Sequence, residues 1–182
     1  ILNESAHHGY KLLENLLEWS RTQTKTIQYN PISFPIKDIL EQTCYLLKPN
    51  ADQKNIALSL EIVVNQLVYG DPNMILTIIR NLVTNAIKFT QKNGTIKVKA
   101  NTIDQEIVIS VEDNGIGIEE QDIPKLFDIG SKISNPGTEN EKGTGIGLIL
   151  CKEFAQINKG KITARSEVGK GSTFSVTLPI AK

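Results

Sequence analysis

The chain has 182 residues, 40% of them hydrophobic, which supports one well-buried domain with an appendage. Its 20 basic and 20 acidic side chains cancel, so nothing in this charge balance suggests a nucleic-acid-binding surface, and no nucleic-acid partner is expected. With two cysteines and no apolar run of about 18 residues, a disulfide framework and a membrane span within this sequence are both disfavoured.

Residues 1–28 are predicted to form one long helix. Apolar or small residues recur there at alternating steps of four and three, the spacing of a paired-helix bundle. The residues in this pattern are Leu2, Ala6, Gly9, Leu13, Leu16 and Ser20. Because one side of this helix is strongly apolar, we expect it to pair with another helix. Pro31 and Pro35 end the pattern, so we expect a bundle helix at 1–28 and a second domain at 29–182.

The second domain alternates predicted helices with predicted strands. The strands are expected at 32–34, 56–64, 67–69, 96–100, 107–111, 161–166 and 173–178. The helices are expected at 36–54, 72–89 and 145–158, with a short helical stretch near 119–127. Asp71-Pro72 is a helix start signal, with Asp71 as the cap. This order predicts an α+β fold, a two-layer sandwich with a mixed sheet and helices on one face.

The predicted helix at 72–89 carries polar residues along one face. Asn81, Asn85 and Lys88 are spaced i, i+4, i+7, beside a predicted buried stripe. The stripe consists of Ile75, Ile79, Leu82 and Ala86. An amide oxygen is a hard ligand suited to Mg²⁺, and a lysine one turn on can neutralise phosphates. For these three residues alone, a solvated polar face is the plainer alternative.

Two glycine-rich segments follow. The first, 113–117, comes directly after a strand, where the Asp113 carboxylate can accept the exocyclic amine of adenine and two glycines let the backbone approach the base. An ordinary Asn-Gly turn is the alternative. The second, 143–148, opens a helix, where unpaired N–H groups and the helix dipole favour an anion. It matches neither the dinucleotide-binding fingerprint nor a P-loop.

Taken together, the three segments resemble the ATPase domain of histidine kinases, a family that also includes gyrase-type ATPases and Hsp90. The matching segments are 81–90 (the N box), 113–117 and 143–148 (two glycine boxes), and 169–174 with 178–179 (the closing strand). Residues 12–21 are similar to the second helix of the dimerisation domain that precedes this ATPase domain. The resemblance extends over about residues 31–180.

The resemblance implies ATP and Mg²⁺ as ligands. By it, Asn85 ligates Mg²⁺ with Asn81 in support, and Lys88 contacts phosphate. The other residues expected to bind ATP lie in or next to the glycine boxes and the F box. They are Gly115, Gly117, Ile118, Phe127, Gly143, Thr144, Gly145, Gly147 and Leu148.

The resemblance also implies which residues recognise the adenine base. At one motif, this sequence departs from the family pattern. Asp113 is expected to bind the adenine amine, with Ser172 or Thr173 and a water behind it. In the F box, the family's paired phenylalanines around a proline are reduced here to residues 126–129, with Phe127 remaining. The contacts expected for the lid, the long glycine-rich loop at 114–144, therefore depart from the family pattern.

Asn81 favours a kinase over a hydrolase. The gyrase and Hsp90 relatives place a glutamate there to activate water, whereas an amide cannot take a proton, and losing a general base costs about 10²–10⁴-fold. The site suits holding ATP until an imidazole attacks the γ-phosphate. Alternatives are a degenerate ATP-binding regulatory module, an ATPase of the wider family without histidine phosphotransfer, and a serine kinase of the anti-sigma type.

The phosphate acceptor is not evident in this sequence. The family's histidine lies on the first dimerisation helix and precedes an acidic residue, whereas His7 and His8 precede Gly9-Tyr10-Lys11 in what resembles the second helix. We therefore expect the acceptor helix to lie outside this fragment, and the fragment to bind ATP without phosphorylating itself.

The resemblance implies partners and a location as well. Expected partners are the protein's own dimerisation helices, as a homodimer of the full-length protein, and a response regulator. The fragment is expected to be the cytoplasmic part of a membrane-anchored sensor kinase. Two plainer expectations are a buried, inert Cys151 and a solvated lid tip at residues 139–142.

Overall fold

The structure is a computed structural model that describes residues 26–128, 136–139, 141 and 143–182, together with Gly9, Leu13, Leu16, Leu17, 20–22 and Thr24. The described positions between 9 and 22 are helical, and the three leucines among them are exposed. The prediction of one helix over 1–28 lies largely outside the described residues, as do His7 and His8. Pairing of this helix with another stays a prediction.

The remaining elements follow the predicted order closely. They are β1 (Ile32–Phe34), α2 (Ile36–Gln53), β2 (Ala57–Val63), β3 (Val68–Gly70), α3 (Pro72–Phe89), β4 (Thr95–Ile103), β5 (Glu106–Asp113), the 3₁₀ helix η1 (Glu120–Phe127), α4 (Gly147–Ile157), β6 (Lys161–Glu167) and β7 (Gly171–Pro179).

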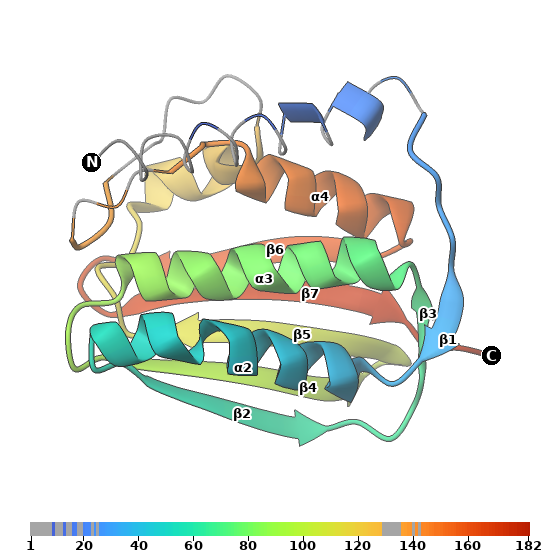
Figure 1. Cartoon of the computed structure of the whole chain (residues 1–182), viewed down its shortest axis with the longest axis horizontal. Helices are drawn as coiled ribbons and strands as arrows, with labels where there is room; N and C mark the ends of the chain where they lie inside the picture. Colours follow the sequence, from blue (N-terminus) through green and yellow to red (C-terminus); the bar gives the residue numbers. More distant parts are fainter. Residues whose placement is uncertain are drawn as a thin grey trace.

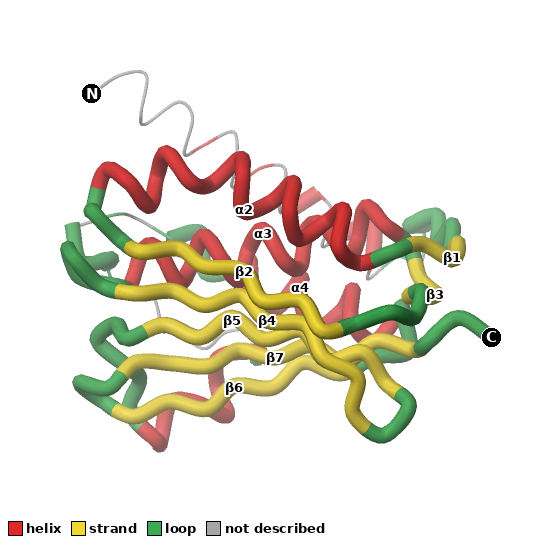
Figure 2. The backbone as a smooth tube through the Cα atoms, turned by 90° about the horizontal axis from the view of Figure 1, so that it is seen from below, coloured by secondary structure: helices red, strands yellow, loops and turns green. Residues whose placement is uncertain are grey.

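A five-stranded mixed sheet forms one layer, and helices form the other. Its strand order is β2-β4-β5-β7-β6, with β2 parallel to β4 and the other pairs antiparallel. Figure 1 shows α2, α3 and α4 side by side over the sheet, and Figure 2 shows that all three lie on the same face. The predicted α+β two-layer sandwich is confirmed.

Alternation along the strands explains why the helices cover a single face. On β5, Ile107, Ile109 and Val111 are buried, while the residues between them are partly exposed. The predicted stripe of α3 is buried against this surface, and Ile75 and Ile79 are fully buried. Each such side chain contributes about 1.5–3 kcal/mol on burial, so the register of α3 on the sheet is strongly fixed.

The strands β2 and β3 are adjacent in sequence but do not pair with each other. β2 pairs in parallel with β4, whereas β3 pairs with β1 in a separate two-stranded sheet. Parallel neighbours need a long crossover connection, and α3 supplies it between β2 and β4. As part of this connection, α3 lies on the face of the sheet that the helices cover.

Two helices differ in detail from the predicted ones, one in its type and the other in its first residue. The stretch near 119–127 is a 3₁₀ helix that contains Pro124, whose missing N–H disfavours a regular α-helix. α4 begins at Gly147 rather than Gly145. Gly145 has a φ of +71°, a left-handed conformation that cannot be part of a right-handed helix.

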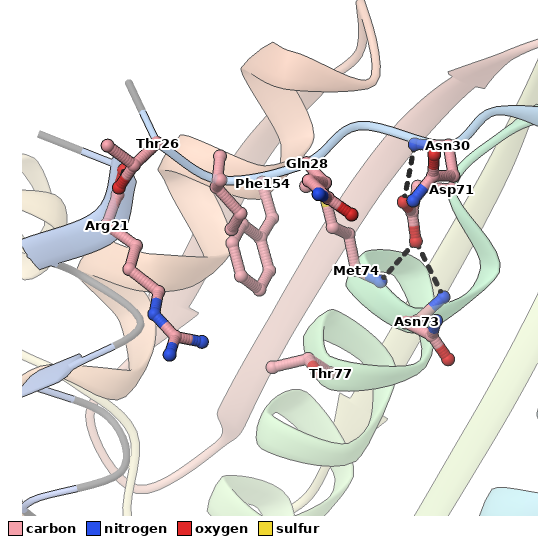
Figure 3. Close-up of a pocket in the computed structure, with 10 residues that line it drawn as sticks. Arg21, Thr26, Gln28, Asn30, Asp71, Asn73, Met74, Thr77 and Phe154 are labelled. Atoms are coloured by element: carbon pink, nitrogen blue, oxygen red, sulfur yellow. Dashed lines mark hydrogen bonds between the residues drawn. The ribbon is translucent and has the colours of Figure 1, made fainter. Parts of the chain in front are cut away.

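The N-terminal end of α3 is held by a buried polar cluster. Asp71 caps the helix as predicted, since its Oδ1 accepts the N–H groups of Asn73 (2.9 Å) and Met74 (3.2 Å), and Oδ2 accepts the N–H of Asn30 (2.9 Å) (Figure 3). The fully buried Asn158 accepts the Asp71 N–H through Oδ1 at 2.7 Å. The end of α4 is thereby tied to the start of α3.

A cavity of about 520 Å³ lies beside this cluster (Figure 3). It is lined by the segment before β1 and by residues of α3 and α4, among them Gln28, Met74, Thr77 and Phe154. It borders the N-terminal half of α3, and the residues predicted to bind nucleotide are not among those that line it. No helix in the described parts of the chain is long and apolar enough for a membrane crossing.

We predict that Asn158→Ala destabilises the domain by about 1–3 kcal/mol, because the buried Asp71 N–H loses its acceptor. Urea denaturation measures this. Asn73→Ala, at an exposed position of the same cluster, is the control and should change stability by less than about 0.5 kcal/mol. Equal effects of the two substitutions would contradict the assigned role of Asn158.

Candidate functional site

The predicted polar face of α3 lies at the edge of its buried stripe. Asn81, Asn85 and Lys88 are all half-buried. The Asn81 side chain donates from Nδ2 to the carbonyl of Thr77 at 2.9 Å. This bond fixes the amide plane, so the Asn81 Oδ1 has a defined direction.

The second glycine segment runs along this same edge of α3. A Cβ added to Gly147 would lie 3.0 Å from Oδ1 of Asn81, and one added to Gly143 would lie 2.8 Å from Nζ of Lys88. A side chain at either position would meet these polar groups. Gly143 and Gly147 are thus neighbours of Lys88 and Asn81 although they are far apart in sequence.

The first glycine segment meets the C-terminal end of α3. The Ile116 N–H donates to the carbonyl of Phe89, the last residue of α3, at 3.1 Å. Gly115 is packed so closely on that carbonyl that an added Cβ would overlap it. Asp113, at the end of β5, continues the alternation of the buried residues of that strand. All three predicted segments therefore meet around the C-terminal half of α3.

The Asp113 carboxylate is largely buried, and its hydrogen bonds to the described residues use only one of its two oxygens. Its Oδ1 accepts the N–H groups of Gly115 (2.9 Å) and Ser172 (3.3 Å). Burial raises the pKa of Asp113, and these two hydrogen bonds oppose the rise. Both bonds use Oδ1, which leaves Oδ2 as the oxygen able to accept a further donor.

The register of β5 on β7 distinguishes between Ser172 and Thr173, the two residues predicted to support Asp113 in binding adenine. Ser172 is directly opposite Asp113 on β7 and is buried, whereas Thr173 is opposite Glu112. Neighbouring residues of a strand point to opposite faces, so Ser172 shares the face of Asp113 and Thr173 does not. The structure therefore favours Ser172.

A serine that the sequence analysis missed completes this corner. Ser166 Oγ donates to the Gly171 carbonyl (2.9 Å), accepts the Ile118 N–H (2.8 Å) and contacts Ser172 Oγ (2.9 Å). Because a hydroxyl has one hydrogen, Ser172 is the donor in the last pair. Nothing in the sequence around Ser166 singles it out, since its role comes from the pairing of β6 with β7.

The surroundings of Lys88 combine burial with a nearby carboxylate. Its Nζ lies 4.6 Å from the centroid of the Phe89 ring. Burial lowers the pKa of Lys88, and the negative charge of Glu141 opposes the change. A cation held in partly desolvated surroundings attracts an anionic ligand more strongly than one in bulk water.

The remaining predicted residues lie at the margins of this region. Thr144 is half-buried and Gly145 is exposed. Ile118, Phe127 and Leu148 are half-buried and pack against the core. Their packing gives no direct sign of a ligand contact, so their part in binding stays a prediction.

The prediction of a solvated lid tip is wrong for Glu141. Glu139 is exposed and pairs with exposed Lys92, but Glu141 is partly buried and pairs with the buried Lys54 at 3.0 Å. No local pattern marks Lys54, because its partners are distant in sequence. The predicted burial of Cys151 is confirmed.

Comparison with known proteins identifies the family. The family described as histidine kinase-, DNA gyrase B-, and HSP90-like ATPase matches residues 70–182. The chain is 34% identical over 194 residues to the sensor protein GacS of Pseudomonas syringae pv. syringae, covering 100% of this chain and 21% of GacS. It is 30% identical over 183 residues to the histidine protein kinase DivJ of Caulobacter vibrioides, covering 99% of this chain and 30% of DivJ. The chain thus spans less than a third of either relative.

Solved structures agree with this result. Full-length ShkA in complex with AMPPNP matches with a TM-score of 0.85 and 25% identity, covering 100% of this chain and 38% of ShkA. A nucleotide-free catalytic domain of the histidine kinase ThkA matches with a TM-score of 0.70 and 26% identity, covering 84% of this chain and 96% of that one. ThkA in complex with the response regulator protein TrrA shares the fold, with a TM-score of 0.77 and 22% identity, covering 100% of this chain and 50% of ThkA. The chain therefore belongs to the family of histidine kinase-, DNA gyrase B- and HSP90-like ATPases, and its relatives there are sensor histidine kinases.

Proposed function

We propose that this domain binds Mg-ATP and transfers the γ-phosphate to a histidine on a dimerisation helix of a two-component sensor kinase. The observation that carries the proposal is the meeting of three segments around α3. Gly143 lies against Lys88, Gly147 against Asn81, and Gly115 against the last carbonyl of α3. ShkA, which has the same fold, was solved with the ATP analogue AMPPNP, which supports ATP as the ligand.

The side chains present fit a magnesium–nucleotide complex. Mg²⁺ requires six oxygen ligands and is often held by one or two protein groups plus waters and phosphate oxygens. In the described part of the chain, no group of three His, Cys, Asp or Glu residues could hold a metal ion. The Asn85 amide oxygen is our candidate ligand, with Asn81 in support. The bound ion neutralises charge on the phosphates.

The residues of the chain position the reaction rather than perform proton transfer. Asp113 Oδ2 accepts the adenine amine, Lys88 neutralises phosphate, and residues 143–148 enclose the phosphates. The imidazole nitrogen of the acceptor forms a bond to the γ-phosphorus as the bond to the leaving ADP oxygen breaks. Because Asn81 cannot act as a general base, water is not activated, and transfer to histidine is favoured over hydrolysis.

We propose a response regulator as the downstream partner. ThkA, of the same fold, was solved with one, and two relatives of this chain are the sensor protein GacS and the histidine protein kinase DivJ. A kinase that uses ATP and phosphorylates a response regulator works in the cytoplasm, so we propose that this domain is cytoplasmic. We propose that other segments of the protein join it to the sensor.

Asp113→Ala should weaken ATP binding roughly tenfold to a hundredfold, because the adenine amine loses its acceptor at a cost of about 1–3 kcal/mol. Isothermal titration calorimetry measures the affinity. Glu112→Ala is the matched control, because Glu112 lies one residue earlier and pairs with Lys99 at 2.7 Å. Unchanged ATP affinity in Asp113→Ala would remove Asp113 from the site.

This chain should not phosphorylate itself, but it should phosphorylate a dimerisation-domain fragment of the full-length protein that carries the acceptor histidine. Incubation with γ-labelled ATP, with and without that fragment, tests both statements. Label on His7 or His8 would show that the acceptor is misassigned. Strong ATP binding without transfer to any histidine would instead indicate a regulatory module.

Asp113→Asn should raise the stability of the nucleotide-free domain at neutral pH. Burial raises the folded pKa of Asp113 above its ordinary value of 3.8, so the folded state binds this proton more tightly than the unfolded state does. The unfolding free energy therefore falls as pH rises through the folded pKa. In the Asp113→Asn variant, the amide oxygen can accept the same two N–H groups without the free-energy cost of burying a carboxylate charge. Urea denaturation between pH 4 and 7 should show a gain that shrinks at low pH, and a less stable variant at pH 7 would contradict this reasoning.

A further inference from the structure

Lys54 is a buried cation outside the predicted nucleotide site. It follows the last residue of α2 and is 3% exposed. A lysine is almost never this buried unless its charge is paired. Lys54 is not among the residues predicted to bind nucleotide, so it has no direct part in the mechanism proposed above.

The ammonium group of Lys54 joins the end of α3 to the lid. Four oxygens lie within hydrogen-bond distance of its Nζ and share its three N–H groups: the carbonyls of Ile87 (2.8 Å) and Lys88 (3.2 Å), Thr138 Oγ1 (2.6 Å) and Glu141 Oε1 (3.0 Å). The two carbonyls belong to the last turn of α3, where a cation is favourable. The other two partners precede the second glycine segment.

The described lid residues form a compact turn on this anchor. Thr138 donates its N–H to the Lys88 carbonyl at 3.0 Å and its hydroxyl lies 2.9 Å from the Thr90 carbonyl. The Gly137 N–H donates to the Glu141 carbonyl at 2.9 Å, and the Glu139 N–H donates to Glu141 Oε2 at 2.7 Å. This turn ends two residues before Gly143, the glycine that faces Lys88.

The charge of Glu141 explains why the anchor matters for binding. Burial acts to raise the pKa of Glu141, but hydrogen bonds from backbone N–H groups and from Lys54 outweigh it and lower the pKa. Glu141 is therefore ionised at neutral pH, close enough to act on Lys88. Without Lys54, this carboxylate would oppose an anionic ligand at Lys88.

We infer that Lys54 is a positioning residue for ATP: it holds Thr138 and Glu141 against the end of α3, which sets the entry of the phosphate-binding glycine segment and neutralises Glu141 beside Lys88. This inference rests on the proposed ATP-binding function. The geometry of the phosphate end of the site, rather than the adenine end, then depends on the ion pair between Lys54 and Glu141, which lie 87 positions apart in the sequence.

The test compares Lys54→Met, Glu141→Gln and the double variant. Lys54→Met should weaken ATP binding roughly tenfold, within the usual range for coupled neighbours, and should change AMP binding much less. Adding Glu141→Gln should restore most of the ATP affinity, because the unpaired carboxylate is removed. Lys92→Met, which breaks the exposed pair with Glu139, is the control and should leave ATP affinity unchanged.

Hydrogen exchange of the nucleotide-free protein provides a second readout. Peptides that contain Gly137 and Thr138 should exchange faster in Lys54→Met than in the wild type, while core peptides exchange alike in both. Equal losses for ATP and AMP, absence of rescue by Glu141→Gln, or unchanged exchange would each overturn the inference. If the wild type bound no ATP, the proposed function would fail, and the exchange experiment would still decide whether Lys54 anchors the lid.

Discussion

Helix α3 packs its apolar stripe into the core, and this packing leaves Asn81, Asn85 and Lys88 along the edge of the helix. The same helix presents its last carbonyl to Ile116. The two glycine segments therefore approach one helix from different directions. A shift of α3 on the sheet would move the two amides, Lys88 and the contact with the turn at 113–117 together, so the burial of its stripe sets the geometry of the whole candidate site.

Two buried charges flank this helix, and their surroundings differ. Within the described parts of the chain, Asp113 receives two backbone N–H groups and pairs with no cation, and burial raises its pKa. Lys54 is more deeply buried, but carbonyls, a hydroxyl and the Glu141 carboxylate surround its ammonium group. An incompletely satisfied buried group is costly to the folded state and available to a ligand. A buried charged group that is fully hydrogen-bonded and paired stabilises the arrangement of the chain around it.

The local parts of the fold were predictable from sequence, because their signals lie within a few residues. The cap at Asp71, the stripe of α3 and the hairpin of β4 and β5 are of this kind. Long-range pairing was not predictable: the parallel partner of β2, the separate β1–β3 sheet, and the register that puts Ser172 rather than Thr173 beside Asp113. The role of Lys54 was hidden for the same reason, since Thr138 and Glu141 reach it only in the folded chain.

The central claim is that three separated segments bind a single nucleotide. Titration of the isotopically labelled chain with Mg-AMPPNP, followed by backbone amide NMR, tests it most directly. Resonances of Asn85, Asp113 and Gly145 should all shift with one common dissociation constant. Shifts confined to one segment, or different dissociation constants for the three, would contradict the account.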